Sequence, residues 1–244
     1  MTITDGPTIT DAHRLRIVWL SIGAIAGQVL FTIGWLIGGV LQDPPFSPAR
    51  HDISDQGALT AQHAWLMLVT QGVSGVLTIA FALGALRPAL AIPGRREAIG
   101  PWLLALSLPA IDNVSDAFFR LDCRASDPGC AEATMSWHAQ VHGIVGTVAA
   151  FITFAAPFVL LRRLRQAPGW RPLWWPTLIT GIAFVVALNV YAFLGGRDGS
   201  GIAQRALAVI ACTWIVLLAV HVIRLNPPIG PDGRAAERLI EKAV

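Results

Sequence analysis

The sequence predicts an all-α membrane protein, a polytopic helical bundle that crosses the bilayer about six times. Hydrophobic residues make up 54% of the chain and charged residues 14%, whereas soluble domains carry roughly 25% charged residues. The mean hydropathy is +0.59. Several apolar stretches reach the roughly 20 residues that a spanning helix requires. A soluble core cannot use this much apolar sequence. We therefore expect membrane lipids as partners of the chain and do not expect it to bind nucleic acid.

The predicted spans form one domain, residues 17–225, between a cytoplasmic segment 1–16 and a cytoplasmic tail 226–244. The spans are Ile17–Leu41, Ala64–Leu86, Trp102–Arg120, His138–Leu161, Trp174–Leu194 and Ala206–Leu225. The third stretch holds Pro109 near its middle and ends in a polar sequence. We keep it as a span because the orientation of its neighbours requires a crossing there.

Basic residues set the orientation, because they favour cytoplasmic loops. One set of connections carries Arg14, Arg16, Arg87, Arg95, Arg96, Arg162, Arg163, Arg165, Arg171, Arg224, Arg234, Arg238 and Lys242. The opposite connections carry fewer arginines and most of the acids. We therefore expect both termini in the cytoplasm and the acid-rich loops outside.

With this topology, ionisable residues meet at the outer ends of the second, third and fourth spans. They are Arg50, His51, Asp52, Asp55, His63, Asp112, Asp116, His138 and His142. Ionisable groups at membrane depth are costly, and their presence there suggests a function.

The spacing of these residues predicts a metal site. His138 and His142 are four residues apart, so their imidazoles share one helix face and can share an ion. Asp112 and Asp116 have the same spacing near a negative helix end that disfavours carboxylates. His63, His138, His142 and one aspartate would suit zinc or another divalent metal. The alternative is structural, with histidines hydrogen-bonded to the aspartates or to lipid headgroups.

The first outer loop supplies further candidates. Ser54 and Asp55 could act in catalysis, with Asp55 or an aspartate of the third span as general base. The predicted substrate-binding residues are Arg50, His51, Arg120 and Gln71. Structural roles compete with these, because a Ser or Asp can cap a helical turn and a Gln can bond across membrane helices.

The three cysteines indicate one disulfide. Cys123 and Cys130 share an outer loop, where an oxidising exterior favours their pairing, and thiolate metal ligation is the alternative. Cys212 lies within the sixth span, so we interpret it as a packing residue.

The run Ser47 to Ala58, the Asp-x-Gly-Cys element at Asp127 and the Trp137-His138-x-x-x-His142 element resemble the bacterial multipass family called domain of unknown function 998. That resemblance implies a bacterial cytoplasmic membrane location and brings no reaction with it. The His-x-x-x-His pair is also similar to that of the transmembrane hydrolases that include alkaline ceramidases and adiponectin-type receptors. Those proteins have seven spans and carry the pair on the last one, whereas this chain carries it on the fourth.

These observations favour a zinc-type membrane hydrolase that acts on a lipid or lipid-linked substrate at the outer face. A non-enzymatic proton-coupled carrier or a lipid-binding accessory protein is the main alternative, because intramembrane acids and histidines serve those functions too. A haem-binding electron carrier that uses His63 and His142 is a third. The sequence leaves the oligomeric partner undefined.

Overall fold

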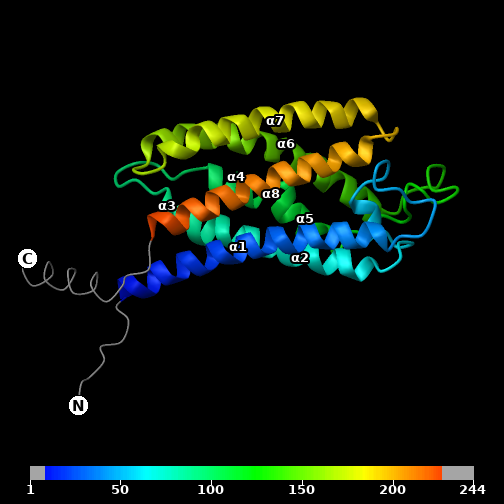
Figure 1. The fold of residues 1–244 in the computed structure, drawn as a ribbon, viewed down its shortest axis with the longest axis horizontal. Coiled ribbons are helices and arrows are strands. Elements are labelled where there is room, and N and C mark those ends of the chain that lie inside the picture. The colour runs from blue at the N-terminus through cyan, green and yellow to red at the C-terminus, as the bar shows by residue number, and fades with distance from the viewer. Residues whose placement is uncertain (1–8, 227–244) are drawn as a thin grey trace, which may run out of the picture.

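The computed structural model describes residues 9–226, and the first half of the segment 1–16 and all of the predicted tail except its first residue lie outside them. Within the described part, five helices are long and apolar enough to cross a membrane (Figure 1). They are α1 (Ile9–Val40), α2 (Ala64–Phe81, continued through η2, Ala82–Leu86, and α3, Arg87–Ala89), α6 (Trp137–Gln166), α7 (Trp174–Leu194) and α8 (Ser200–Leu225). No strand occurs between residues 9 and 226. The prediction of an all-α membrane bundle is confirmed.

The third predicted span is broken rather than continuous. Its residues form α4 (Gly100–Ala105), a π-helical turn η3 (Leu108–Asp112) and α5 (Asn113–Asp116). Ser107 takes an extended conformation, with ψ 172°, and Pro109 then removes a backbone donor. The freed Leu108 N–H donates to Thr153 Oγ1 on α6 at 2.8 Å. This bond satisfies the backbone group in the way that a break at membrane depth requires.

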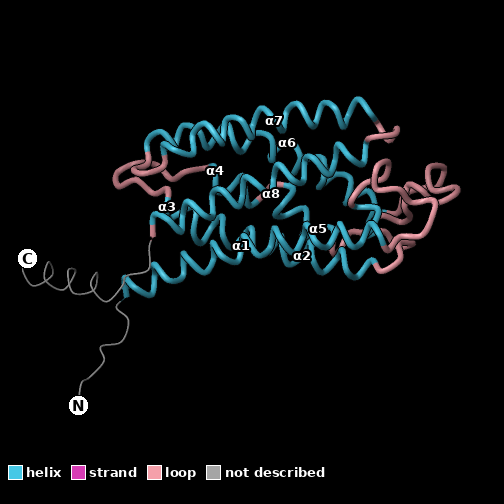
Figure 2. The backbone as a smooth tube through the Cα atoms, viewed as in Figure 1, coloured by secondary structure: helices cyan, strands magenta, loops and turns pink. Residues whose placement is uncertain are grey.

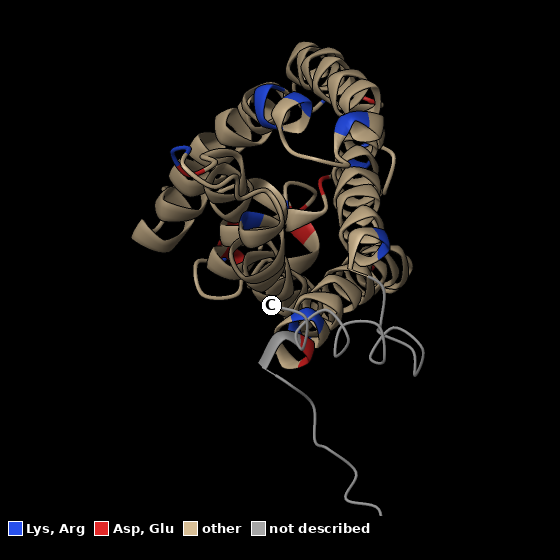
Figure 3. Ribbon diagram, turned by 90° about the vertical axis from the view of Figure 1, so that its left-hand side faces the viewer, with Lys and Arg blue, Asp and Glu red and all other residues tan. Residues whose placement is uncertain are grey.

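The bundle has two distinct ends (Figure 2). We call the end that holds the start of α1, residues 90–99, residues 167–173 and the end of α8 the terminal end, and the end that holds residues 41–63, 117–136 and 195–199 the loop end. The described chain therefore begins and finishes at the same end. This is expected because the five long helices and the broken third segment together make an even number of passes between the two ends. Viewed from the terminal end, several helices carry arginine close to their ends (Figure 3).

The hydrophobic core lies mainly toward the terminal end. The largest buried cluster includes Phe81, Leu104, Leu160 and Leu218. A smaller cluster nearer the loop end includes Phe31 and other residues from α1, α2 and α8. The helices are therefore packed most completely at the terminal end, which leaves space between them nearer the loops.

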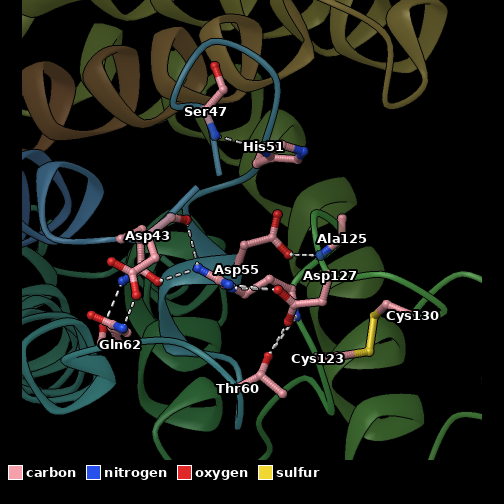
Figure 4. Close-up of polar contacts among 12 residues, drawn as sticks. Asp43, Ser47, His51, Asp55, Thr60, Gln62, Cys123, Ala125, Asp127 and Cys130 are labelled. Atoms are coloured by element: carbon pink, nitrogen blue, oxygen red, sulfur yellow. Dashed lines mark hydrogen bonds and ion pairs between the residues drawn. A yellow bond between two sulfur atoms is a disulfide. The ribbon is translucent and has the colours of Figure 1, made fainter. Parts of the chain in front are cut away.

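A polar network orders the loop end (Figure 4). Cys123 and Cys130 form a disulfide, so that prediction is confirmed. The Arg124 guanidinium is buried and donates to Asp127 Oδ1 at 2.7 Å. It also donates to the Asp43 carbonyl oxygen at 3.2 Å. These contacts tie the loop after α5 to the loop after α1, because Asp43 and Asp127 belong to different connections.

Candidate functional site

A cavity of about 820 Å³ lies among α1, α2, η3, α5, α6, α7 and α8. We call it the membrane cavity. Its walls are mostly apolar, with Phe31, Leu108, Phe154 and Leu207 among them. Its size lies within the range of roughly 300–1,000 Å³ typical of ligand sites. The broken third segment lines it from Leu108 to Asp116, so the irregular backbone occurs where it borders this cavity.

Three ionisable side chains line one wall of this cavity: Asp112, Asp116 and His142. We call them the acid–histidine centre. Both aspartates are buried and lie one helical turn apart, at the junction of η3 with α5 and on α5. His142 projects from α6 and places Nδ1 2.8 Å from Asp116 Oδ1. The outer ends of the third and fourth predicted spans therefore lie side by side, and their packing brings these three residues together.

The hydrogen bonding of His142 fixes its tautomer. Nδ1 lies 3.1 Å from the carbonyl oxygen of Phe119. A carbonyl only accepts, so Nδ1 must carry the proton. Asp116 Oδ1 also lies close to Nδ1, at 2.8 Å, and a carboxylate oxygen likewise accepts, so it favours a proton on the same nitrogen. The neutral ring then keeps a lone pair on Nε2.

Asp112 supplies an unsatisfied buried group. Its Oδ1 has no hydrogen-bond partner within residues 9–226. An ideal Cβ at Gly146 would lie 3.5 Å from this oxygen, so glycine on α6 leaves the carboxylate side open. Two buried carboxylates beside one histidine are costly unless a proton or a cation is shared among them. The centre is therefore suited to holding and moving a proton.

Gly75 on α2 allows the broken segment to lie close. An ideal Cβ there would come 2.6 Å from the Ala110 carbonyl oxygen and 2.8 Å from Val114 Cγ2. These atoms belong to η3 and α5, the segments that carry both aspartates. The absence of a side chain at Gly75 thus positions the acid side of the centre.

The membrane cavity opens sideways between α6 and α7. Thr147 and Phe151 of α6, and Asn189 and Ala192 of α7, line the cavity and are exposed. Nearer the terminal end the two helices are in close contact, because a Cβ at Gly181 would lie 2.8 Å from Phe158 Cζ. The opening is therefore confined to the half of the bundle nearer the loops. Gly143 of α6 also lines the cavity and has nothing within 4 Å of an ideal Cβ, so it borders open space rather than a neighbouring helix.

A second cavity of about 770 Å³ lies among the loops. We call it the loop cavity. It is more polar, and Arg50, His51, Asp55 and Ser200 line it. Arg50 pairs with Asp198 at 3.6 Å, and both side chains are exposed. His51 Nδ1 accepts from the Ser47 N–H at 2.8 Å.

Hydrogen bonds stabilise the two carboxyl groups of this loop, the half-buried Asp52 and the buried Asp55. Asp55 accepts from the N–H groups of Ala125 at 2.9 Å and Asp52 at 3.1 Å. Tyr191 donates its hydroxyl to Asp52 Oδ2 at 2.5 Å. Burial raises the pKa of both Asp52 and Asp55, and these hydrogen bonds oppose that rise.

The structure separates other predicted site residues from the acid–histidine centre. His63 precedes α2 with a left-handed backbone, φ 51°, and is exposed. His138 is exposed and stacks on Trp137 at 3.6 Å between ring centroids. Neither lines the membrane cavity. Within the described residues, no three His, Cys, Asp or Glu side chains are grouped so that they could hold a metal ion.

The remaining candidate site residues either line one of the two cavities or form hydrogen bonds with the backbone. Gln71 lines the membrane cavity, and Ser54 lines both cavities. The Arg120 guanidinium donates to the carbonyl oxygens of Gly57 and Ala58, each at 2.8 Å. That arginine therefore holds the end of η1 (Ser54–Gly57) in place.

Sequence reasoning missed Tyr191 and Asn189, which α7 brings to the membrane cavity. Tyr191 is the only tyrosine of the chain. A hydroxyl near the end of an otherwise apolar helix could have indicated a functional contact, because a buried tyrosine usually finds a hydrogen-bond partner. The partner, Asp52, lies on a distant loop and is not evident from spacing.

A family model described as "Protein of unknown function (DUF998)" matches residues 25–221, so the chain belongs to this family. The match covers the second half of α1, most of α8 and all of the segments between them, including the broken third segment. No curated protein and no solved structure matches the chain.

Proposed function

We propose that this DUF998 protein is a membrane hydrolase that acts on a lipid or lipid-linked substrate. The observation that carries the proposal is the acid–histidine centre in the wall of a largely apolar cavity of about 820 Å³ that opens between α6 and α7. A sideways opening in a membrane-spanning bundle faces lipid, so the substrate would come from the bilayer. We place the loop end on the extracytoplasmic side of a bacterial cytoplasmic membrane, because arginines gather at the terminal end and the disulfide lies in the loops.

The proposed chemistry uses His142 as general base. Its Nδ1–H is held by the Phe119 carbonyl, so Nε2 is free to accept a proton. For a carboxylic ester, the water oxygen bonds to the carbonyl carbon while Nε2 takes a water proton. The bond to the leaving oxygen then breaks, and Nε2 returns the proton to that oxygen, giving an acid and an alcohol. Asp116 stabilises the imidazolium in between, as the aspartate of a catalytic triad does.

The proposal also has a metal-dependent form. Zinc or another divalent metal would have Asp112, Asp116 and His142 as its ligands, since only these members of the predicted ligand set line the membrane cavity. Their side chains are not grouped closely enough to hold an ion as they stand, so this form requires them to move together. The unpartnered Asp112 oxygen suits a cation as well as it suits a proton. When bound, the metal would supply a water of lowered pKa. Metal analysis of the purified protein distinguishes the two forms: the metal-dependent form requires a bound metal that His142→Gln loses and His63→Gln keeps.

The test of hydrolysis uses the full chain in nanodiscs made from bacterial lipid extract, with lipids followed by mass spectrometry. We expect a substrate lipid to disappear and its acid and alcohol products to appear with the wild type. The His142→Gln variant should lose about a hundredfold to ten-thousandfold in rate, the usual contribution of a general base. His138→Gln is the matched control on the same helix, and it should retain the rate because its exposed ring stacks on Trp137. Equal rates for the two variants would contradict the assignment.

A second candidate function is a proton-coupled carrier of a lipid-like solute. The broken third segment favours it, because discontinuous helices commonly form transporter sites. Proteoliposomes with an internal pH dye test it. Substrate-driven acidification that is lost in Asp112→Asn, without any new lipid product, would replace the hydrolase by the carrier. Lipid bound without turnover or transport would instead indicate a lipid-binding accessory protein.

A further inference from the structure

We propose that the loop cavity and the membrane cavity together hold one elongated amphiphile, a membrane lipid with its headgroup among the loops. The headgroup would occupy the loop cavity and an acyl chain the membrane cavity. This inference rests on the proposed function for its lipid substrate and adds the position of that substrate in the site.

The two cavities adjoin. Asp52, Ser54, Leu121 and Tyr191 line both of them. Three of these come from the loops at residues 41–63 and 117–136, and Tyr191 comes from the last turns of α7. The Tyr191–Asp52 hydrogen bond joins the two sides at this boundary. A molecule that enters between α6 and α7 therefore passes this pair to reach the loops.

The walls change character across that boundary. The membrane cavity is lined mainly by phenylalanine, leucine and alanine, which suits a hydrocarbon chain. The loop cavity is lined by Arg50, His51, Asp198 and Ser200, which offer charges of both signs together with hydrogen-bond donors and acceptors. Such groups suit a polar headgroup. Apolar surface on one side and polar groups on the other match the two parts of an amphiphile.

The loop that forms the headgroup side is firmly held on α8. Ser200 Oγ donates to the Arg50 carbonyl at 2.7 Å. Arg205 donates to the carbonyl oxygens of Pro48 at 2.6 Å and His51 at 2.8 Å. An ideal Cβ at Gly201 would lie 2.5 Å from the His51 carbonyl oxygen, so only glycine permits this close approach. The loop cavity is thus a preformed part of the fold.

The acid–histidine centre lies close to the boundary. His142 contacts the carbonyl of Phe119, two residues before Leu121, which lines both cavities. A lipid that spans both cavities would therefore present to His142 the bond that joins its headgroup region to a chain. We expect cleavage at that junction rather than inside the headgroup.

Photo-crosslinking tests this arrangement without requiring turnover. The photoreactive amino acid p-benzoylphenylalanine would replace Ala125, an exposed residue of the loop cavity, or Gly143, which has open space around it. The full chain with His142→Gln would be illuminated in nanodiscs of phosphatidylethanolamine and phosphatidylglycerol. Mass spectrometry would identify the attached lipid atoms. We expect headgroup attachment at Ala125 and acyl-chain attachment at Gly143, on the same lipid species.

A cavity-filling substitution shows whether one molecule occupies both cavities. Thr147→Trp on α6 fills the sideways opening, whereas Val148→Trp is exposed and lies off the cavity. Thr147→Trp should reduce lipid capture at Ala125 to background, and Val148→Trp should leave it unchanged. No lipid at Ala125, or equal capture in both variants at matched thermal stability, would overturn the proposal. Lipid capture without hydrolysis by the wild type would refute the hydrolase and leave the shared site standing.

Discussion

The close approach of α2 to the broken third segment makes Gly75 a sensitive position. In Gly75→Ala the new Cβ would lie 2.6 Å from the Ala110 carbonyl oxygen and 3.0 Å from the Val114 nitrogen. Both are backbone atoms, so the broken segment itself must move, and Asp112 and Asp116 move with it. Overpacking of this kind costs about 1–3 kcal/mol.

Gly143→Ala is the matched control, because nothing lies within 4 Å of its Cβ. Replacing a helical glycine by alanine gains roughly 0.5–1 kcal/mol of helix stability at either position. That gain cancels in the comparison, so the difference between the two variants isolates the steric cost at Gly75. We expect Gly75→Ala to be less stable than Gly143→Ala by about 1–3 kcal/mol, measured by denaturant titration in mixed micelles. Equal stabilities would refute the close packing of η3 and α5 on α2.

Three further predictions follow from the loops and the centre. The double variant Cys123→Ser, Cys130→Ser removes a disulfide between residues seven positions apart. The chain-entropy relation predicts that its free energy of unfolding falls by about 2.5 kcal/mol. An unchanged thermal midpoint in that variant would argue against a stabilising disulfide. Burial raises the pKa of Asp52 above its ordinary 3.8, so the folded loop binds a proton more tightly than the unfolded chain. Its contribution to stability is therefore present at low pH and is lost as pH rises through the folded pKa. The wild type should gain stability relative to Asp52→Asn as pH falls toward 3.8, and a difference that is constant across the titration would contradict this. Tyr191→Phe removes the donor to Asp52 and should lower stability by about 1.5–3 kcal/mol, the usual range for a hydrogen bond to a charged group, when compared with the wild type by the same titration.

The helical architecture follows from the sequence because its cause is local. Long apolar stretches must satisfy their own backbone groups in lipid, and helices do so within one segment. The broken third span shows where this reasoning stops. Pro109 indicated a weak helix, but the break also depends on Thr153, which accepts the freed Leu108 N–H from another helix. A tertiary partner of that kind cannot be found by spacing.

The candidate site could be predicted only in part, because local spacing does not reveal tertiary contacts. Helical periodicity placed His138 and His142 on one face, yet only His142 reaches the membrane cavity. His138 lies in the first turn of α6, beyond the cavity, and is exposed beside Trp137. The depth of each residue in the bundle decides its role, and periodicity carries no information on depth. The boundary pair Asp52 and Tyr191 joins residues 139 positions apart, which local patterns cannot connect.

Hydrolysis at the acid–histidine centre is tested most directly in water labelled with the heavy oxygen isotope. The purified full chain in nanodiscs would be incubated in this water, and the lipid products would be analysed by mass spectrometry. We predict one labelled oxygen in the acid product of the wild type and none above background with His142→Gln. Absence of label in every lipid with the wild type, or equal labelling in the two proteins, would contradict a hydrolase centred on His142.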